Sequence, residues 1–372
     1  MRIRRGFRYR LFPTPEQEAR LRCWEGALRA LWNTAHSQRL VLIERGAKMP
    51  SAFDQINEGT ELRAAVPWLA AVPRNACAQV LINLDLARQR SFSGLARRPR
   101  WKRKGRDRIN LTEQHPRQFR LTTEAIVFPK LGAIHAALHR PIMGTPKQCT
   151  IRREVDQWFA VVQCESVVPD PTPRTAPVVA IDRGVRVLLA DSEGARVQNP
   201  KFLERTLRRL ARAQRVVGRR RKGSHRWRRS VQRVGILHRK GRRQRQHLLH
   251  VLSNRYANSH GVVVVERLNV QGMVRGRLGR QIADAGWSTF VAMLRYKLQA
   301  RGGTLAEVPA AYSSQTCSVC ARVDAASRDA GQFDCVACGH RDHRISTQRR
   351  CSSAVEPAAV LAVEGKAQSR PL

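Results

Sequence analysis

The chain opens with a stretch in which apolar and basic residues alternate. Phe7, Tyr9 and Leu11 are separated by arginines, which predicts a strand with one buried face and one basic face. Thr14 follows, with Gln17 three residues later, and this spacing is the capping-box pattern of a helix start. The pattern therefore predicts a strand followed directly by a helix.

Apolar residues at helical spacing continue through the first hundred residues. The first helix has its apolar face at Leu21, Trp24, Leu28 and Leu31. We expect it to end near Gly46, and we expect a second helix after Pro73. The apolar face of that second helix consists of Val80, Leu81, Leu84 and Phe92. We interpret the aromatic residues of the first helix as core rather than as nucleic-acid contacts.

Residues 119–165 return to short strand-like runs. Pro and Gly separate these runs, which predicts a small barrel that the first strand also joins. Residues 168–177 then contain four prolines. A stretch of this composition is extended and stiff, so it predicts a linker and a domain boundary.

Two apolar runs in the second half of the chain each end in a carboxylate. Residues 178–182 end in Asp182 and turn at Gly184 into another apolar run, and residues 262–266 end in Glu266. Taken alone, Asp182 is more simply explained as a turn residue that accepts local hydrogen bonds. Taken together, two carboxylates on adjacent strands can hold a divalent metal ion through oxygen ligands.

The charge of the chain indicates a polyanionic partner. Its 372 residues carry 69 Lys and Arg against 28 Asp and Glu, a formal net charge of +41. Nucleic acid is the simplest partner for such an excess. A membrane partner is not expected, because we find no lipidation signal and no apolar run long enough to span a bilayer. Residues 1–10 are too charged for a signal peptide, and five scattered cysteines favour a reducing cytosol.

Two segments concentrate the positive charge. Residues 97–108 form a basic loop, in which Trp101 is either a base-stacking residue or part of a solvated charge run. Residues 201–250 contain 19 Lys and Arg and one acid, Glu204, and their apolar residues keep helical spacing. We expect a helical hairpin there, interrupted at Gly218, Gly223, Gly235 and Gly241.

The candidate nucleic-acid contacts come from these two segments. In the basic loop they are Arg97, Arg98, Arg100, Trp101, Lys102, Arg103 and Lys104. In the hairpin they are Arg219, Arg220, Arg221, Lys222, Arg226, Arg228 and Arg229. A nearly single-sign surface of this kind is suited to binding phosphates, since an ordinary soluble surface mixes both signs.

Four cysteines near the C-terminus have the spacing of a zinc ribbon. Cys317, Cys320, Cys335 and Cys338 form a C-x2-C-x14-C-x2-C pattern, and two such pairs can close a tetrahedral four-sulfur site. Redox pairs or unrelated thiols are the alternative. A closed four-thiolate site has no open position for a substrate, so the zinc is expected to be structural.

Seven short sequence motifs are spread along almost the whole chain, and both their residues and their order are informative. They read FRYRLFPTPEQ, RPRWKRKGR, FPKLG, VVAIDRGV, VVVVERLNVQGM, AGWSTFVAMLRYKL and YSSQTCSVC with CVACGH. In content and order they resemble the transposon-encoded TnpB (OrfB) family of RNA-guided DNA nucleases, which is related to type V CRISPR effectors.

The resemblance implies a multidomain α/β fold. A wedge-type β-barrel carries an inserted helical recognition module with the basic loop. A RuvC-like RNase H fold follows a Pro-rich linker and contains the four-Cys zinc ribbon. The implied bounds are 1–13 and 114–168 for the barrel, 14–113 for the module, 169–177 for the linker, 178–316 and 339–349 for the nuclease domain, 199–255 for its basic hairpin and 317–338 for the ribbon.

The resemblance also implies a function and its partners. The family's first two catalytic carboxylates fall on Asp182 and Glu266, and its ribbon ligands fall on the four cysteines. Mg2+ is the implied catalytic cofactor, with two ions clamping the scissile phosphate. Guide RNA and target DNA are the implied partners, and guide pairing supplies sequence recognition. The implied location is the prokaryotic cytosol or nucleoid, and the oligomeric state stays open.

One departure from the family concerns the third catalytic carboxylate. The family has Asp-x-Asn-Ala-Ala shortly after the ribbon, and here Ile345 stands in place of the Asp. Asp342 is either a substitute ligand or a surface residue beside the ribbon. Codons for Asp-Leu-Asn-Ala-Ala that lose one nucleotide can encode residues 345–349 as they stand, which predicts an aberrant tail at 350–372.

An endonuclease with impaired cleavage is therefore the first hypothesis. The alternatives are a cleavage-deficient RNA-guided DNA-binding protein and a nonspecific DNA-binding accessory of transposition.

Overall fold

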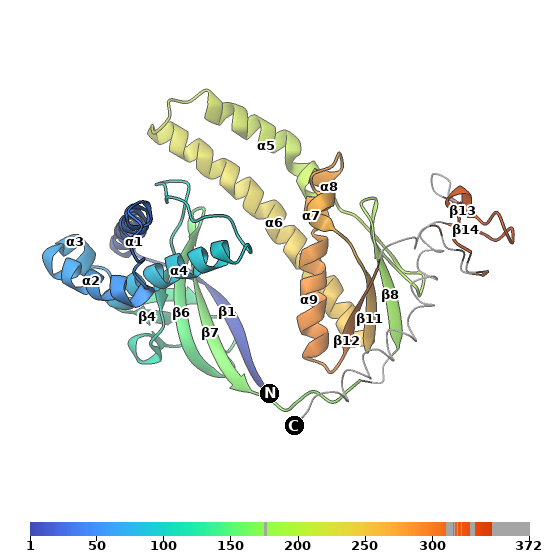
Figure 1. The fold of residues 1–372 in the computed structure, drawn as a ribbon, viewed down its shortest axis with the longest axis horizontal. Helices are drawn as coiled ribbons and strands as arrows, with labels where there is room; N and C mark the ends of the chain where they lie inside the picture. The colour runs from blue at the N-terminus through green and yellow to red at the C-terminus, as the bar shows by residue number, and fades with distance from the viewer. Residues whose placement is uncertain are drawn as a thin grey trace. The chain divides into compact units, whose positions relative to one another are not determined.

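A computed structural model of the chain describes residues 1–174, 177–309, 315, 317, 319–320, 322–327 and 332–343. The structure divides into two compact units, Met1–Pro169 and the chain from Asp170 onward, and each unit has its own apolar core. Ile345 and the tail at 350–372 lie outside the described residues. Figure 1 labels the elements used below.

The first unit contains a seven-stranded antiparallel sheet in the order β2-β6-β7-β1-β5-β4-β3. The strands are β1 (Arg2–Phe12), β2 (Leu111–Glu113), β3 (Arg120–Leu121), β4 (Ala125–Phe128), β5 (Gly132–Ala137), β6 (Thr145–Glu154) and β7 (Gln157–Val167). As predicted, β1 joins the later strands, between β7 and β5, and buries Phe7, Tyr9 and Leu11. Because β2 and β3 are the edge strands of this order, the pairing does not show a sheet closed into a barrel, and the barrel stays a prediction.

Four helices lie between β1 and β2 in the chain. They are α1 (Pro15–Glu44), α2 (Ala52–Ala65), α3 (Pro67–Ala70) and α4 (Arg74–Phe92). The predicted capping box is confirmed, because Gln17 N donates to Thr14 Oγ1 and Thr14 N donates to Gln17 Oε1. Helix α2 was not predicted. It starts with a second capping box, formed by Ser51 and Asp54, and its burial is slight.

Two expectations for this unit need correction. Phe92 was assigned to the apolar face of α4 but is 68% exposed, because the chain turns away at Gly94 (φ 70°) directly after the helix and leaves the last turn uncovered. Strand β2 falls inside the range 14–113 assigned to the helical module, yet it pairs with β6 and so belongs to the sheet.

The second unit contains a five-stranded mixed sheet in the order β10-β9-β8-β11-β12. Its strands are β8 (Val178–Arg183), β9 (Val187–Asp191), β10 (Arg196–Gln198), β11 (Val262–Arg267) and β12 (Thr304–Pro309). β8 and β9 form the predicted hairpin, while β11 pairs in parallel with β8 on one side and β12 on the other. The buried runs of Val, Ile and Leu favour such central strands.

The helices of the second unit are α5 (Phe202–Gly218), α6 (His225–Ser259), α7 (Val270–Met273), α8 (Gly279–Ala285) and α9 (Trp287–Gln299). The predicted basic hairpin is confirmed as α5 and α6 (Figure 1). Gly235 and Gly241 do not interrupt α6, contrary to the prediction. Each glycine costs a helix only about 1 kcal/mol, which the packing of Leu249 and Tyr256 into the core outweighs.

The ribbon region contains β13 (Gln332–Asp334), β14 (Arg341–His343) and the short 3-10 helix Ala325–Ser327. β13 and β14 pair antiparallel in a sheet of their own. Across the described helices of the whole chain, none combines the length and apolar character that a bilayer span requires.

Candidate metal and nucleic-acid sites

Two carboxylates, here called the carboxylate pair, lie at neighbouring strand ends in the second unit. Asp182 and Glu266 are the penultimate residues of β8 and β11. The two strands are parallel, and Ile181 lies opposite Val265. The next position in this register is Asp182 beside Glu266, and adjacent strands are about 4.8 Å apart. The sheet thus brings together two residues that are distant in sequence.

Both members of the carboxylate pair project from one face of the sheet. Side chains alternate along a strand, so Asp182 shares its face with Ala180 and Glu266 shares its face with Val264. Ala180 and Val264 form a small apolar cluster with Ala306 of β12. Glu266 is buried and Asp182 is half-buried. The pair can therefore offer oxygen ligands to one divalent cation from a common face.

Arg183 is a third charged group at this site that the sequence analysis did not identify. Its buried guanidinium donates a hydrogen bond from Nη2 to the backbone carbonyl of Glu266. Burial lowers the pKa of Arg183, and the negative charges of Glu266, Asp182 and Glu307 oppose that shift. Arg183 thus joins the ends of β8 and β11. An arginine directly after a strand-ending Asp is the sequence signal that could have revealed it.

Asp342, the candidate substitute ligand, has its backbone in β14, opposite Phe333 of β13. This strand pair is separate from the five-stranded sheet that carries the carboxylate pair. Within the described residues, no further His, Cys, Asp or Glu joins Asp182 and Glu266 in a cluster tight enough to hold one ion. A ligand role for Asp342 stays a prediction.

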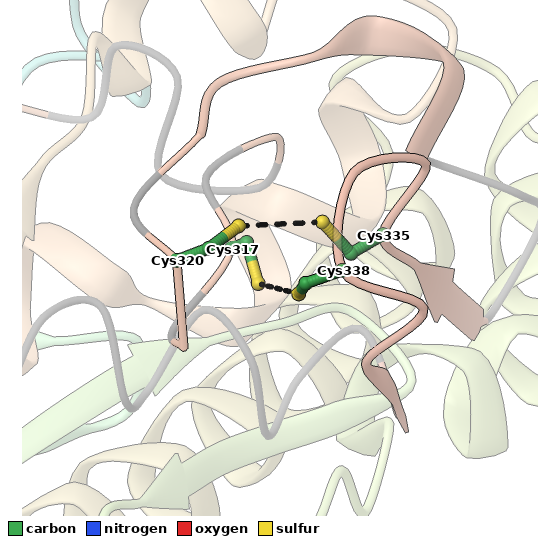
Figure 2. Close-up of side chains that lie close together, drawn as sticks. All are labelled: Cys317, Cys320, Cys335 and Cys338. Atoms are coloured by element: carbon green, nitrogen blue, oxygen red, sulfur yellow. Dashed lines mark hydrogen bonds between the residues drawn. The ribbon is translucent and has the colours of Figure 1, made fainter.

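The four cysteines of the ribbon converge on one point, as Figure 2 shows. All four sulfur atoms lie within 4.8 Å of one another. The Sγ atoms of Cys317 and Cys338 are 3.6 Å apart, as are those of Cys320 and Cys335. Four thiolates at about 2.3 Å from a tetrahedral zinc ion would be about 3.8 Å from one another, so the observed spacing fits such an ion.

Local backbone hydrogen bonds shape the two cysteine turns. Cys317 N donates to the Arg322 carbonyl, and Gly339 N donates to the Cys335 carbonyl, both at 2.9 Å. Hydrogen bonds, the largest contribution coming from the Cys338 backbone N–H, lower the pKa of the Cys335 thiol to about 6, which favours its thiolate form. The thiolate is the form that binds metal, so the backbone of the turns favours metal binding at this position.

The basic loop of residues 97–108 is anchored to α1 by its backbone. Trp32 Nε1 donates to the Arg100 carbonyl at 3.2 Å, and Asn33 exchanges two hydrogen bonds with the backbone of Lys102 at 3.0 and 2.8 Å. Most of the loop's candidate contacts are exposed, namely Arg97, Arg98, Arg100, Trp101, Arg103 and Lys104. A fixed backbone with outward cations is suited to following a phosphate chain.

Trp101 and Lys102 are partly held by neighbouring rings. The Trp101 ring centre is 5.2 Å from that of His36, and the side chain remains 46% exposed. The half-buried Lys102 has its Nζ 4.6 Å from the Trp32 ring centre. The structure thus leaves part of Trp101 accessible, and base stacking stays a prediction for it.

The connection between α5 and α6 gathers the other candidate cations. Helix α5 ends at Gly218, and Ser224 caps α6 by accepting from Trp227 N at 3.1 Å. All seven candidate side chains there are exposed: Arg219, Arg220, Arg221, Lys222, Arg226, Arg228 and Arg229. In the part of the chain that the structure describes, none of them has an ion-pair partner. Their charge is available to an external anion.

A cavity of about 420 Å³ lies elsewhere in the second unit, between the start of α5 and α8. Arg280 and Asp284 are among its lining residues. Both Asp284 oxygens are engaged, because they accept hydrogen bonds from Leu203 N at 3.0 Å and Arg245 Nη1 at 2.8 Å. The carboxylate pair does not line this cavity, so the two features are separate.

Three family descriptions match successive parts of the chain. "Helix-turn-helix domain" matches residues 1–48, "Probable transposase" matches residues 161–277, and "Cas12f1-like, TNB domain" matches residues 287–344. The transposase match contains the carboxylate pair, and the last match contains all four ribbon cysteines. In the structure, residues 1–48 contain one strand and one long helix, β1 and α1.

Two curated relatives, both named "Putative RNA-guided DNA endonuclease", match most of the chain. The protein InsQ of Escherichia coli (strain K12) is 29% identical over 344 residues, which cover 86% of this chain and 84% of the relative. The Streptomyces pristinaespiralis protein is 29% identical over 337 residues, which cover 86% of this chain and 81% of the relative. A solved structure of Cas12f1 in complex with single guide RNA and target DNA aligns with this chain at a TM-score of 0.55 and 12% sequence identity. The alignment covers 94% of this chain and 99% of the Cas12f1 chain.

The fold and the sites define a strongly basic α/β protein of two units with a four-cysteine cluster that could hold a metal ion. Its resemblance to the transposon-encoded TnpB (OrfB) family, which the sequence motifs indicated, is confirmed by the matched families and relatives. The solved Cas12f1 structure shares its fold.

Proposed function

We propose that this chain is an RNA-guided DNA-binding protein with the architecture of an RNA-guided DNA endonuclease, and that its cleavage activity is impaired. Guide RNA and target DNA are its partners, in the prokaryotic cytosol or nucleoid. The observation that carries the proposal is the register of β8 and β11, which sets Asp182 beside Glu266 on one face. This arrangement supports a RuvC-like RNase H interpretation of the second unit.

The charge of the molecule supports the nucleic-acid partners. Part of the net charge of +41 lies in two exposed segments, the basic loop, whose single acid is Asp107, and the α5–α6 connection, which contains no acid. Such segments bind phosphates without regard to sequence, so specificity would come from guide pairing. The relatives that match most of the chain carry names with this activity.

The donor sets fit two different metal ions. Four thiolates with no open position fit a structural zinc ion, which stabilises the ribbon. The oxygen donors of Asp182 and Glu266 fit Mg2+, which accepts a few carboxylates and keeps waters and phosphate oxygens. Bound there, the ions would supply an activated water and stabilise the leaving oxygen of a phosphodiester. Arg183 positions the Glu266 end of β11 through its hydrogen bond.

The predicted impairment follows from the sequence after the ribbon. Ile345 occupies the place of the third carboxylate in the family motif, and an isoleucine side chain cannot ligate a cation. Two carboxylates alone hold the ions less tightly, so in-line attack on the phosphate should be slow or absent. The basic surfaces lie upstream of this change and should still bind guide and target.

The test compares the chain as written with a chain restored by one nucleotide inserted before the Ile345 codon. Each protein is expressed with its native flanking DNA, co-purifying RNA is sequenced, and a plasmid matching that RNA is incubated with Mg2+. We expect both proteins to bind the same RNA and its target, and only the restored protein to cut. The restored chain carrying Asp182→Asn is the matched inactive control.

Three outcomes separate the hypotheses. Robust cutting by the chain as written, lost on Asp342→Ala, would overturn the impairment and assign the third ligand to Asp342. Absence of any enriched RNA would favour a nonspecific DNA-binding accessory. RNA-guided binding without cutting by either chain would favour a binding protein that has lost the nuclease function altogether.

A further inference from the structure

The C-terminal end of α4 presents apolar side chains to solvent, within a segment whose charged residues are all Lys or Arg. Phe92, in the last turn of the helix, and Leu95, just beyond it, are 68% and 81% exposed. Residues 86–106 contain nine Lys and Arg and no Asp or Glu. Neighbouring apolar side chains left in water mark an interaction site more often than isolated ones do, and here the surrounding charge restricts the partner.

The backbone that carries these two side chains is ordered. Gly94 N donates to the Ser91 carbonyl at 3.2 Å, and Ala96 N donates to the Arg90 carbonyl at 3.0 Å. Gly94 has φ 70°, a left-handed conformation that ends helices and favours glycine. The chain therefore reverses in a defined turn, and Phe92 and Leu95 sit on its two sides rather than on a free tail.

A buried cation supports the Phe92 ring. The guanidinium carbon of Arg88 is 5.8 Å from the ring centre, and Arg88 is 8% exposed. Its Nε has no hydrogen-bond partner among the described residues. Burial lowers the pKa of Arg88, and the nearby positive charges of Arg39 and Arg98 lower it further. Of these three arginines, Arg39 is paired with Asp85 at 2.8 Å, and Arg88 is the one that lies next to the ring.

We propose that Phe92 and Leu95 contact the face of an unpaired nucleic-acid base while the surrounding cations hold the phosphates of the same strand. The inference rests on the proposed nucleic-acid-binding function and adds a base-contacting element to it. Every base has a π face, so the contact tolerates any sequence. Among these nine cations, Arg100 pairs with Asp107 at 3.1 Å. An apolar protein partner would bury most of the others without acids to pair them, and the charge favours a polyanion instead.

The experiment separates base contacts from phosphate contacts. Two fluorescein-labelled probes of about 12 nucleotides, a length within the usual site sizes, are compared: an oligothymidylate and an abasic strand with the same number of phosphates. We expect Phe92→Ala to weaken oligothymidylate binding roughly 5- to 150-fold. Its affinity for the abasic strand and its salt dependence should not change. Phe92→Trp should retain the base-dependent affinity.

Two control variants complete the design. Phe53→Ala removes an aromatic ring of similar exposure, 77%, that precedes the acidic Asp54 on α2, and it should bind both probes like the unchanged protein. Arg97→Gln with Arg98→Gln should weaken both probes together and lower the salt dependence, because phosphate contacts are lost. Circular dichroism establishes that each variant is folded.

The possible results either support or overturn the inference. A loss on Phe92→Ala that is equal for both probes, or no loss, overturns it while leaving nucleic-acid binding intact. If the unchanged protein binds neither probe, the proposed function fails and this inference fails with it. A loss confined to oligothymidylate supports the base contact.

Discussion

Removing charge from the connection between α5 and α6 should change how nucleic-acid binding responds to salt. The perturbation replaces Arg219, Arg220, Arg221 and Lys222 with glutamine. All four side chains are exposed and lack ion-pair partners in the described structure. Each phosphate that they neutralise contributes about 0.7 to the log–log salt slope of single-strand binding. The slope should therefore fall by up to about 2.8.

Fluorescence anisotropy with a single-stranded RNA, at salt concentrations between about 50 and 200 mM, measures this slope. Over such a fourfold range, a slope difference of about 2.8 corresponds to a factor of about fifty. When salt rises from about 50 to about 200 mM, the RNA affinity of the unchanged protein should therefore fall by a factor about fifty times larger than the RNA affinity of the variant. Folding should be little affected, since the substitutions remove no internal contact.

A charge-matched control excludes a general effect of net charge. It removes four exposed cations that already face a carboxylate, namely Arg22, Lys147, Lys201 and Arg295, which pair with Glu18, Glu165, Glu204 and Glu307. Such surface pairs contribute about 0–1 kcal/mol each, so this control should also fold. Equal slopes for the two variants would refute the assignment of phosphate contacts to the α5–α6 connection.

Three further predictions address the metal sites and the core. Cys335→Ser leaves three thiolates and should reduce the zinc content of the purified protein well below one ion per chain by elemental analysis; a full zinc content would reject the ribbon assignment. In the frame-restored chain, Asp182→Asn or Glu266→Gln should abolish Mg2+-dependent cutting and spare RNA binding, whereas retained cutting would show the pair to be structural. Tyr256→Phe should destabilise the second unit by about 1–3 kcal/mol in urea denaturation, because the phenol donates at 2.8 Å to the buried Asp191; an unchanged midpoint would contradict this.

Local signals predicted single elements well. The capping box of Thr14 and Gln17 is a contact between residues three apart, so spacing alone located the start of α1. The alternation of Phe7 and Tyr9 likewise identified the buried face of β1. Helix α2 was missed because Ala52 and Gln55 are its only buried residues, and so shallow a burial leaves almost no apolar periodicity.

Contacts between residues that are far apart in sequence determined three features that the pattern of apolar and polar residues did not predict. Gly235 and Gly241 look like interruptions in sequence, yet the core contacts further along α6 keep the helix continuous. Phe92 fits the apolar spacing of α4, but spacing does not indicate where the covering elements end. The adjacency of Asp182 and Glu266 depends on parallel pairing of β8 with β11, and periodicity within either strand contains no information about its neighbour.

The order of β8, α5, α6 and β11 along the chain has a consequence for assembly on the ribosome. The contacts between α5 and α6 are local and can form as soon as the hairpin emerges, whereas β8 and the core-packed end of α6 must wait for β11 and α9 to be synthesised. A nascent chain therefore presents its strongest cationic surface while Asp182 still lacks Glu266. We expect RNA binding by the hairpin to precede completion of the carboxylate pair, so that translation itself separates these two events in time. Ribosome-bound chains ending just before Val262 should already retain RNA.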